Sequence, residues 1–224
     1  MASPETLTSS LEQLQKLGLF NGVGDVYLAM MTKEGTETEK PTFTKPMVAA
    51  EGVELGLTPV YAEGSQSASN RTVRKVKTLM GYDVRIAYPR MLATIRDYIL
   101  AHTRDAKGGS VMGDQLQPYV AVGIKETRDD GTCSMRWIYK VRFNEQNVDA
   151  KTAEEGTIAY QIPVLEGSAV RCNTKITPSD GSAPFYPAAY AADTGDESCT
   201  WTEETFFAEV PWYTAEGAAA AQTN

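Results

Sequence analysis

Residues 118–143 read PYVAVGIKETRDDGTCSMRWIYKVRF, and the alternation of apolar and polar residues in this stretch decides the fold. Apolar Val120, Val122 and Ile124 alternate with small or charged neighbours, which predicts a half-buried antiparallel strand. Asp130-Gly131 supplies the positive φ of a tight hairpin connection. In the strand that follows, only Ile138 breaks the alternation, and one face is predicted to carry Met135, Trp137, Tyr139, Val141 and Phe143. The stretch therefore predicts a β-hairpin.

A second hairpin is predicted directly after the first. A polar link over 144–156 leads to a third strand, 158–164, in which Ile158, Tyr160 and Ile162 alternate with other residues. Pro163 has no N–H to donate to a neighbouring strand, so we expect an edge strand or a bulge there. Glu166-Gly167 is typical of a turn, and a fourth strand is predicted over 168–176.

This region resembles the major tail proteins, or tail-tube subunits, of long-tailed non-contractile bacteriophages (siphophages). The resemblance is a pattern of strands and turns that begins near Val48 and covers more than half of the chain. Its residues are Pro118–Lys125, Trp137–Phe143, Glu154–Gly156, Ile158–Pro163 and Glu166–Ala169. The first 20 residues and the region after Pro178 depart from the pattern.

The resemblance and the strand pattern together imply a mainly β fold. We expect two packed antiparallel sheets, sandwich or barrel-like, with one flanking α-helix and extended arms. The expected organisation is an N-terminal arm or short helix over 1–20, a tail-tube β domain over 21–178 and a C-terminal extension over 179–224.

The resemblance also implies a function. Subunits of this family form hexameric rings that stack head to tail into a tube, through which double-stranded DNA passes during ejection. The implied partners are further copies of the chain, a tape-measure protein, and tail-tip and head-proximal tail proteins. The implied location is the tail of the virion, after synthesis in the host cytoplasm. No catalytic residue, metal or cofactor is implied.

Composition agrees with such a protein. At 224 residues and 42% hydrophobic content, the chain is long enough to bury a core as one domain with decorated ends. A net charge of −8 argues against phosphate binding as the main function and suits an acidic lumen that repels DNA. Glu51, Glu54 and Asp83 are the predicted lumen residues. The start lacks a signal peptide, and no run is long enough to span a membrane.

Residues 61–71 are polar and predict a loop that joins two strands. With almost no apolar surface, such a loop either orders on a partner or stays mobile. In tail-tube proteins a long loop at this position contacts the next ring. We therefore predict inter-ring contacts at Tyr61, Glu63, Ser65, Gln66, Ser67, Ser69, Asn70 and Arg71.

Residues 71–78 form the densest basic cluster and lack the interleaved aromatic residues of a single-strand binder. We interpret Arg74, Lys75 and Lys77 either as cations that meet acids of a neighbouring subunit or as a solvated charged face. A further strand is predicted over 81–88. A helix over 90–102 is predicted to cover one face of the sheet.

Other segments complete the pattern. A helix over 3–18 has a leucine stripe that packs either on its own domain or on a neighbour. Strands are predicted over 25–31 and 47–60, with a solvated loop over 32–44. The aromatic segment 206–213 is expected to dock on the parent domain or on an adjacent copy, and 215–224 to be disordered.

Catalytic motifs are missing from the sequence. His102 is its one histidine, which we interpret as a helix-terminal cation or a partly buried residue. Cys133, Cys172 and Cys199 are predicted to be reduced thiols, and the acids near Asp193 lack the spacing of a calcium loop. The alternative function is a monomeric or dimeric β-sandwich binding module that recognises carbohydrate or protein. Such a module would recognise carbohydrate through Trp137, Trp201 and Trp212.

Overall fold

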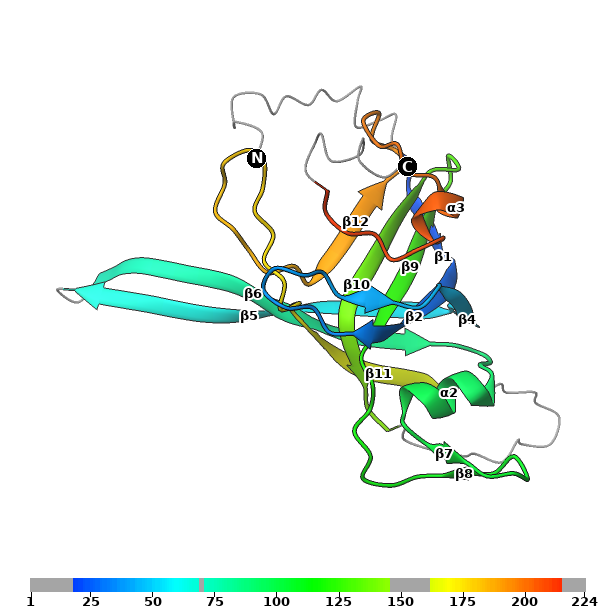
Figure 1. Cartoon of the computed structure of the whole chain (residues 1–224). Helices are drawn as coiled ribbons and strands as arrows, with labels where there is room; N and C mark the ends of the chain where they lie inside the picture. Colours follow the sequence, from blue (N-terminus) through cyan, green and yellow to red (C-terminus); the bar gives the residue numbers. More distant parts are fainter. Residues whose placement is uncertain (1–17, 69–70, 146–161, 215–224) are drawn as a thin grey trace, which may run out of the picture.

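A computed structural model describes residues 18–68, 71–145 and 162–214 of the chain (Figure 1). These residues form a ten-stranded antiparallel sheet, a separate two-stranded sheet and two short helices, which confirms the predicted mainly β class. The strands are β1 Phe20–Val23, β2 Asp25–Lys33, β3 Thr42–Phe43, β4 Met47–Glu51, β5 Glu54–Ala68, β6 Arg71–Ala87, β7 Thr103–Arg104, β8 Ser110–Val111, β9 Val120–Arg128, β10 Cys133–Phe143, β11 Val164–Val170 and β12 Ala189–Asp193. The helices are α2 Ala93–Ile99 and α3 Glu203–Phe206.

The predicted hairpin of 118–143 is β9 and β10, and β10 is the strand around which the large sheet folds. Its first half pairs with β9 and β12, and its last residues pair with β11. The register shifts between Ile138 and Val141, and Lys140 within this bulge has φ of 45°. The layer of β11, β6 and β5 therefore crosses the layer of β2, β9 and β10 (Figure 1).

The bulge corrects the prediction for the faces of β10. Met135, Trp137 and Tyr139 lie in one core, whereas Val141 and Phe143 lie in another together with Ile138. One inserted residue moves all later side chains of a strand to the opposite face. Ile138 breaks the alternation because, with the bulge between them, it shares its face of the strand and its core with Val141 and Phe143.

The first core fills the space between the two layers and extends to α2. It contains, among others, Leu28 of β2, Ile86 of β6, Val122 of β9 and Ile99 of α2. The predicted covering helix is therefore present, although α2 is shorter than residues 90–102. After the helix, Ala101 has φ of 58°, a left-handed conformation that ends a helix.

The second core lies on the other face of β9 and β10, where the C-terminal segment covers it. The indole N–H of Trp137 donates to the carbonyl of Phe206 at 3.1 Å, and the Tyr139 hydroxyl donates to the carbonyl of Pro211 at 2.6 Å. Gly123 leaves room for the indole, because a Cβ there would lie 2.9 Å from the ring. The aromatic segment thus docks on its parent domain.

The predicted second hairpin is wrong in its described part. β11 runs straight through Glu166-Gly167 and lies between β10 and β6, not at an edge. Gly167 serves close packing instead of a turn, since a Cβ there would lie 2.6 Å from the carbonyl oxygen of Arg142. The fourth strand over 168–176 is replaced by the end of β11 and an isolated bridge from Ile176 to Phe185.

The remaining predictions have mixed outcomes. The strand over 25–31 is confirmed as β2. The strand over 47–60 is two strands, β4 and β5, and the loop over 32–44 contains the short β3. Residues 3–17 of the predicted N-terminal helix, residues 158–161 and the tail over 215–224 lie outside the described residues. Neither described helix is long and apolar enough to cross a bilayer.

Candidate assembly surfaces

The most exposed feature of the structure is a ribbon made by the outer halves of β5 and β6, which we call the arm (residues 61–68 and 71–80). β6 pairs with β11 only over Gly81–Ala87, and the N–H of Arg171 donates to the carbonyl of Met80 at 3.3 Å, so from Leu79 outward the described strand pairing is between β5 and β6 alone (Figure 1). At roughly 3.3 Å per residue, the arm extends on the order of 30 Å from the body.

The arm corrects the prediction of a loop at 61–71. β5 and β6 stay paired up to Ala68 and Arg71, with register shifts at Val60/Tyr61 and Gln66/Ser67. Polar composition gave no strand signal, but pairing that begins in the body continues along the arm across these two shifts. Of the predicted inter-ring residues, Ser69 and Asn70 lie outside the described residues, and only strand pairing is described for Gln66, Ser67 and Arg71.

The two faces of the arm differ in chemistry. Tyr61, Glu63 and Lys77 share one face; Lys77 Nζ lies 3.0 Å from Glu63 and 4.3 Å from the centre of the Tyr61 ring. Small or apolar Ala62, Gly64 and Val76 occupy the opposite face, where Val76 is 46% exposed. Both faces of the ribbon are thus open to a partner.

Gly81 marks the point where β6 leaves the body. A Cβ at this position would lie 1.8 Å from the carbonyl oxygen of Ala169 on β11. The strands can approach this closely only because the residue is glycine. The adjoining register shift, at Val60/Tyr61, lets the arm change direction as it leaves the sheet.

The body half of the same strands presents a polar outer face, which we call the acidic face (Glu54, Asp83, Arg85 and Glu166). The pairing of β5 with β6 and of β6 with β11 brings these residues to one side of the sheet. Arg85 Nη1 donates to Glu54 at 2.6 Å, and its Nε lies 3.9 Å from Glu166. Three carboxylates against one guanidinium leave this face negative.

Two of the three predicted lumen residues, Glu54 and Asp83, therefore lie on one exposed face. Glu51 does not join them, because it ends β4 and forms an ion pair with Arg90 at 2.9 Å. Arg85 and Glu166 were missed by the sequence analysis. These two residues can be identified only from the pairing register of β5, β6 and β11, which the sequence alone does not reveal.

The predicted inter-subunit cations lie on the arm. Lys77 is paired with Glu63 within the chain, both side chains being more than half exposed. Lys75 is exposed and has no ion-pair partner among the described residues. For Arg74 only its pairing with Gln66 is described.

Two buried cations of the body are paired with carboxylates. Arg128, 7% exposed at its side chain, donates to both oxygens of Asp193, which lowers the pKa of Asp193. Lys140 pairs with Glu34 and donates to Asn173 at 3.3 Å. The first contact ties β12 to β9, and the second ties the loops that follow β2 and β11 to β10.

The side chain of His102 is buried beside Asp97, and its Nε2 lies 2.7 Å from a carboxylate oxygen of Glu145, which accepts. Burial alone would raise the pKa of Asp97, but the hydrogen bonds it accepts outweigh burial and lower it. Their donors are Ser110, Arg96 and His102. The partly buried reading of His102 fits this cluster, which joins α2 to β8.

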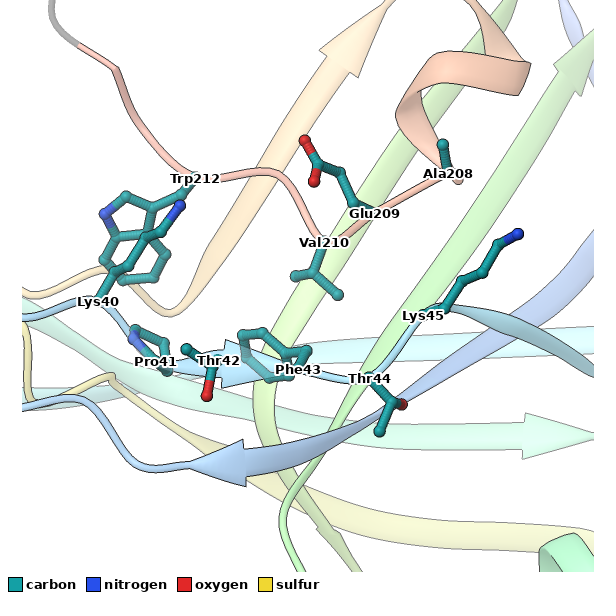
Figure 2. Close-up of a pocket in the computed structure, with 10 residues that line it drawn as sticks. All are labelled: Lys40, Pro41, Thr42, Phe43, Thr44, Lys45, Ala208, Glu209, Val210 and Trp212. Carbon is teal, nitrogen blue, oxygen red and sulfur yellow. The ribbon is translucent and has the colours of Figure 1, made fainter. Parts of the chain in front are cut away.

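A shallow pocket of about 380 Å³ lies between β3 and the C-terminal segment (Figure 2). Phe43, Val210 and Trp212 line it with Lys40 and Glu209. Its threonine hydroxyls are engaged elsewhere: that of Thr44 accepts from the N–H of Met30, and that of Thr42 bonds to Thr32. The lining contains no Cys or His.

Neither a metal site nor a tryptophan platform is found in the described part of the chain. No group of three His, Cys, Asp or Glu there could hold a metal ion. Trp137 is fully buried, and Trp201 and Trp212 pack against the second core. The three cysteines are free thiols, and burial raises the pKa of Cys172 to about 12.

No protein-family model matches the sequence, and no curated protein matches it. Two solved structures are similar in part. One is a chain of the anti-feeding prophage (AFP) baseplate, with 9% identity, a TM-score of 0.37, and coverage of 79% of this chain and 97% of that chain. The other is a chain of the PVC sheath-tube complex of an extracellular contractile injection system in the extended state, with 9% identity, a TM-score of 0.34, and coverage of 83% and 99%. Scores of this size establish neither a shared fold nor a shared function.

Proposed function

We propose that this chain is a structural protein of a phage tail, the tail-tube subunit of a siphophage, which forms hexameric rings that stack into a tube for double-stranded DNA. The observation that carries the proposal is the arm, a β ribbon that continues well past the core of its own domain. The sequence resemblance supplies the ring, the tube and the partners, which are the tape-measure, tail-tip and head-proximal proteins.

The arm is a costly feature for a monomer. A two-stranded ribbon without an apolar cover is at best marginally stable in water. Its strands also offer unpaired N–H and C=O groups along both edges, which invite pairing with other chains. β5 is an edge strand of the large sheet over its whole length. Stacked copies would cover these edges, and a head-to-tail contact of this kind can repeat without limit.

The acidic face supports the proposed conduit. A tube that transmits DNA must not bind phosphates tightly, and a negative wall repels them within a Debye length. Glu54, Asp83 and Glu166 outnumber Arg85 on this face. We propose that it lines the lumen, with DNA passing along it and no base or phosphate specifically bound.

Removal of the arm tests the proposal. Val60 and Gly81 are register partners, so an Asn-Gly turn between them should close a short hairpin in place of residues 61–80. We expect the full chain to form tubes or stacked rings with a central hole in negative-stain electron microscopy across a concentration series. The shortened chain should keep its circular dichroism spectrum and remain small.

Two outcomes would contradict the proposal. If the full chain stays monomeric even when it is given tail-tip complex, the tube is wrong. If the shortened chain builds the same tubes as the full chain, the arm does not carry assembly.

A further inference from the structure

The pocket between β3 and the C-terminal segment, which we call the slot, is bounded by two stretches of chain. One wall is formed by residues 40–45, which include β3, and the other by residues 208–212 (Figure 2). β3 is the last strand on its side of the large sheet, and its one strand neighbour among the described residues is β2. The slot therefore opens beside an edge strand.

Both walls of the slot have backbone groups that are free to pair. Next to Phe43, the N–H of Thr44 donates to the carbonyl of Met30 on β2. Because these groups alternate between the two sides of a strand, the N–H and C=O of Phe43 point away from β2. On the other wall, Glu209 and Val210 form no backbone hydrogen bond in the described part of the chain. Unpaired edge groups of this kind can bind another extended chain.

The side chains of the slot favour an occupant with acidic ends and an apolar middle. Lys40 and Lys45 lie at the two ends of the slot (Figure 2), and both are exposed without an ion-pair partner within residues 18–68, 71–145 and 162–214. Between them, Val210 points toward Phe43 (Figure 2). The carboxylate of Glu209 points away from β3 and leaves the two amines unopposed (Figure 2). An apolar centre within a charged rim is typical of contact surfaces between proteins.

Free backbone groups and two unopposed amines fit one kind of occupant. We propose that an extended acidic segment of another protein enters the slot and pairs with β3. At roughly 3.3 Å per residue, about six residues of that segment match the length of 40–45. A carboxylate at each end faces Lys40 and Lys45, and apolar side chains between them face Phe43 and Val210. This binding site goes beyond the proposed function, because it needs no contact between copies of the chain.

Binding of a synthetic peptide tests the slot. The probe is fluorescein-labelled Glu-Val-Thr-Val-Thr-Glu, titrated with the full chain below the concentration at which it assembles and followed by fluorescence anisotropy. We expect Lys40→Glu with Lys45→Glu to weaken binding at least ~10-fold, because the reversal places like charges together. For the wild type, a peptide with lysine in place of both glutamates should bind at least ~10-fold more weakly. A version N-methylated at its four central residues keeps its charges but loses those main-chain donors, and should be weakened by a similar factor of about ten.

A matched control, Lys75→Glu with Lys107→Glu, changes the net charge equally at exposed positions outside the slot and should bind the peptide like the wild type. Circular dichroism and melting curves verify that each variant is folded. The proposal is wrong if the acidic peptide does not bind, if its N-methylated version binds as tightly, or if reversal of Lys40 and Lys45 has no effect. If that reversal instead raises the concentration at which the chain assembles, a second copy fills the slot, which contradicts a separate partner.

Discussion

The two halves of the β5–β6 pair are built from the same strands but depend on different interactions. In the body half, Leu55, Leu57 and Ile86 face a packed core, and β11 closes the inner edge. In the arm, the described side chains are mostly exposed, and the strands are held by hydrogen bonds across the pair, the Glu63–Lys77 ion pair and the contact of Lys77 with Tyr61. Strand pairing therefore extends beyond the region that hydrophobic burial stabilises. We expect the free energy of unfolding to depend on the body half and self-assembly on the arm.

The sharpest test of this division compares one aromatic residue from each region. Trp137→Ala should lower the free energy of unfolding by about 4 kcal/mol, because it removes a fully buried indole and its hydrogen bond to Phe206. Tyr61→Ala, which removes a half-exposed ring from the arm, should change it by about 0.5 kcal/mol or less. Urea denaturation followed by circular dichroism measures both; equal losses would contradict the division.

Glycines at the junction and on the arm provide a second comparison. Gly81→Ala should destabilise the fold by about 3 kcal/mol, because the new Cβ collides with the backbone of Ala169. Gly64→Ala has open space and should be neutral or stabilising by about 0.5 kcal/mol. Thermal and urea unfolding of the two variants would show the difference, and an unaffected Gly81→Ala variant would mean that β6 does not approach β11 as described.

The buried ion pair of the body gives a prediction that depends on pH. Asp193→Asn leaves the Arg128 guanidinium buried without its carboxylate, and we expect a loss of about 2 kcal/mol at pH 7. This lies below the range for a fully buried pair because Asp193 is 41% exposed and solvent screens it.

The sign of the pH effect follows from the lowered pKa of Asp193. The largest cause of this lowering is the hydrogen bonding from Arg128. The wild type keeps the full contribution above the ordinary carboxyl pKa and loses it as the pH falls through the folded value. The variant should therefore lose less stability as the pH falls from about 5 to about 2, a window that begins just above the ordinary pKa of about 3.9 and extends below it. Asp114→Asn, at an exposed position, is the control. If Asp193→Asn loses as much stability at low pH as the wild type does, the Arg128–Asp193 pair does not contribute to acid destabilisation.

The smallest effect is expected on the arm. Glu63→Gln breaks the ion pair with Lys77, whose members are 68% and 57% exposed, and should change the free energy of unfolding by about 0.5 kcal/mol or less. A loss of 2 kcal/mol or more, on the order of a buried pair, would show that the arm is more than a marginal ribbon in the monomer.

The sequence predicted those elements in which burial leaves a regular pattern. The β9–β10 hairpin was predictable because Val120, Val122 and Ile124 alternate and Asp130-Gly131 is a strong turn signal. The bulge at Lys140 was not, since one extra residue produces only a single exception, Ile138. Gly167 was wrongly predicted as a turn residue, because the sequence does not distinguish a glycine required by close packing from a glycine required by a positive φ.

The candidate surfaces were less predictable than the fold. No local preference marks 61–68 as a strand, because its pairing with β6 continues from the body half of the same strands across two register shifts. The alternation within each predicted strand was enough to place Glu54 and Asp83 on polar faces. That these residues share one face with Arg85 and Glu166 follows only from the order of β5, β6 and β11 in the sheet. Contacts between copies are a property of the assembly, and the strand pattern of one chain does not contain them.

The C-terminal cover on β9 and β10 has a consequence for the order of events during synthesis. Trp137 and Tyr139 hydrogen-bond to residues 69 and 72 positions later in the chain. Until that late segment has left the ribosome, Trp137 and Tyr139 lack these hydrogen bonds and the apolar cover that Phe206 and Phe207 provide. The domain therefore completes its folding only after release of residues 203–213, and the nascent chain needs protection from aggregation until then.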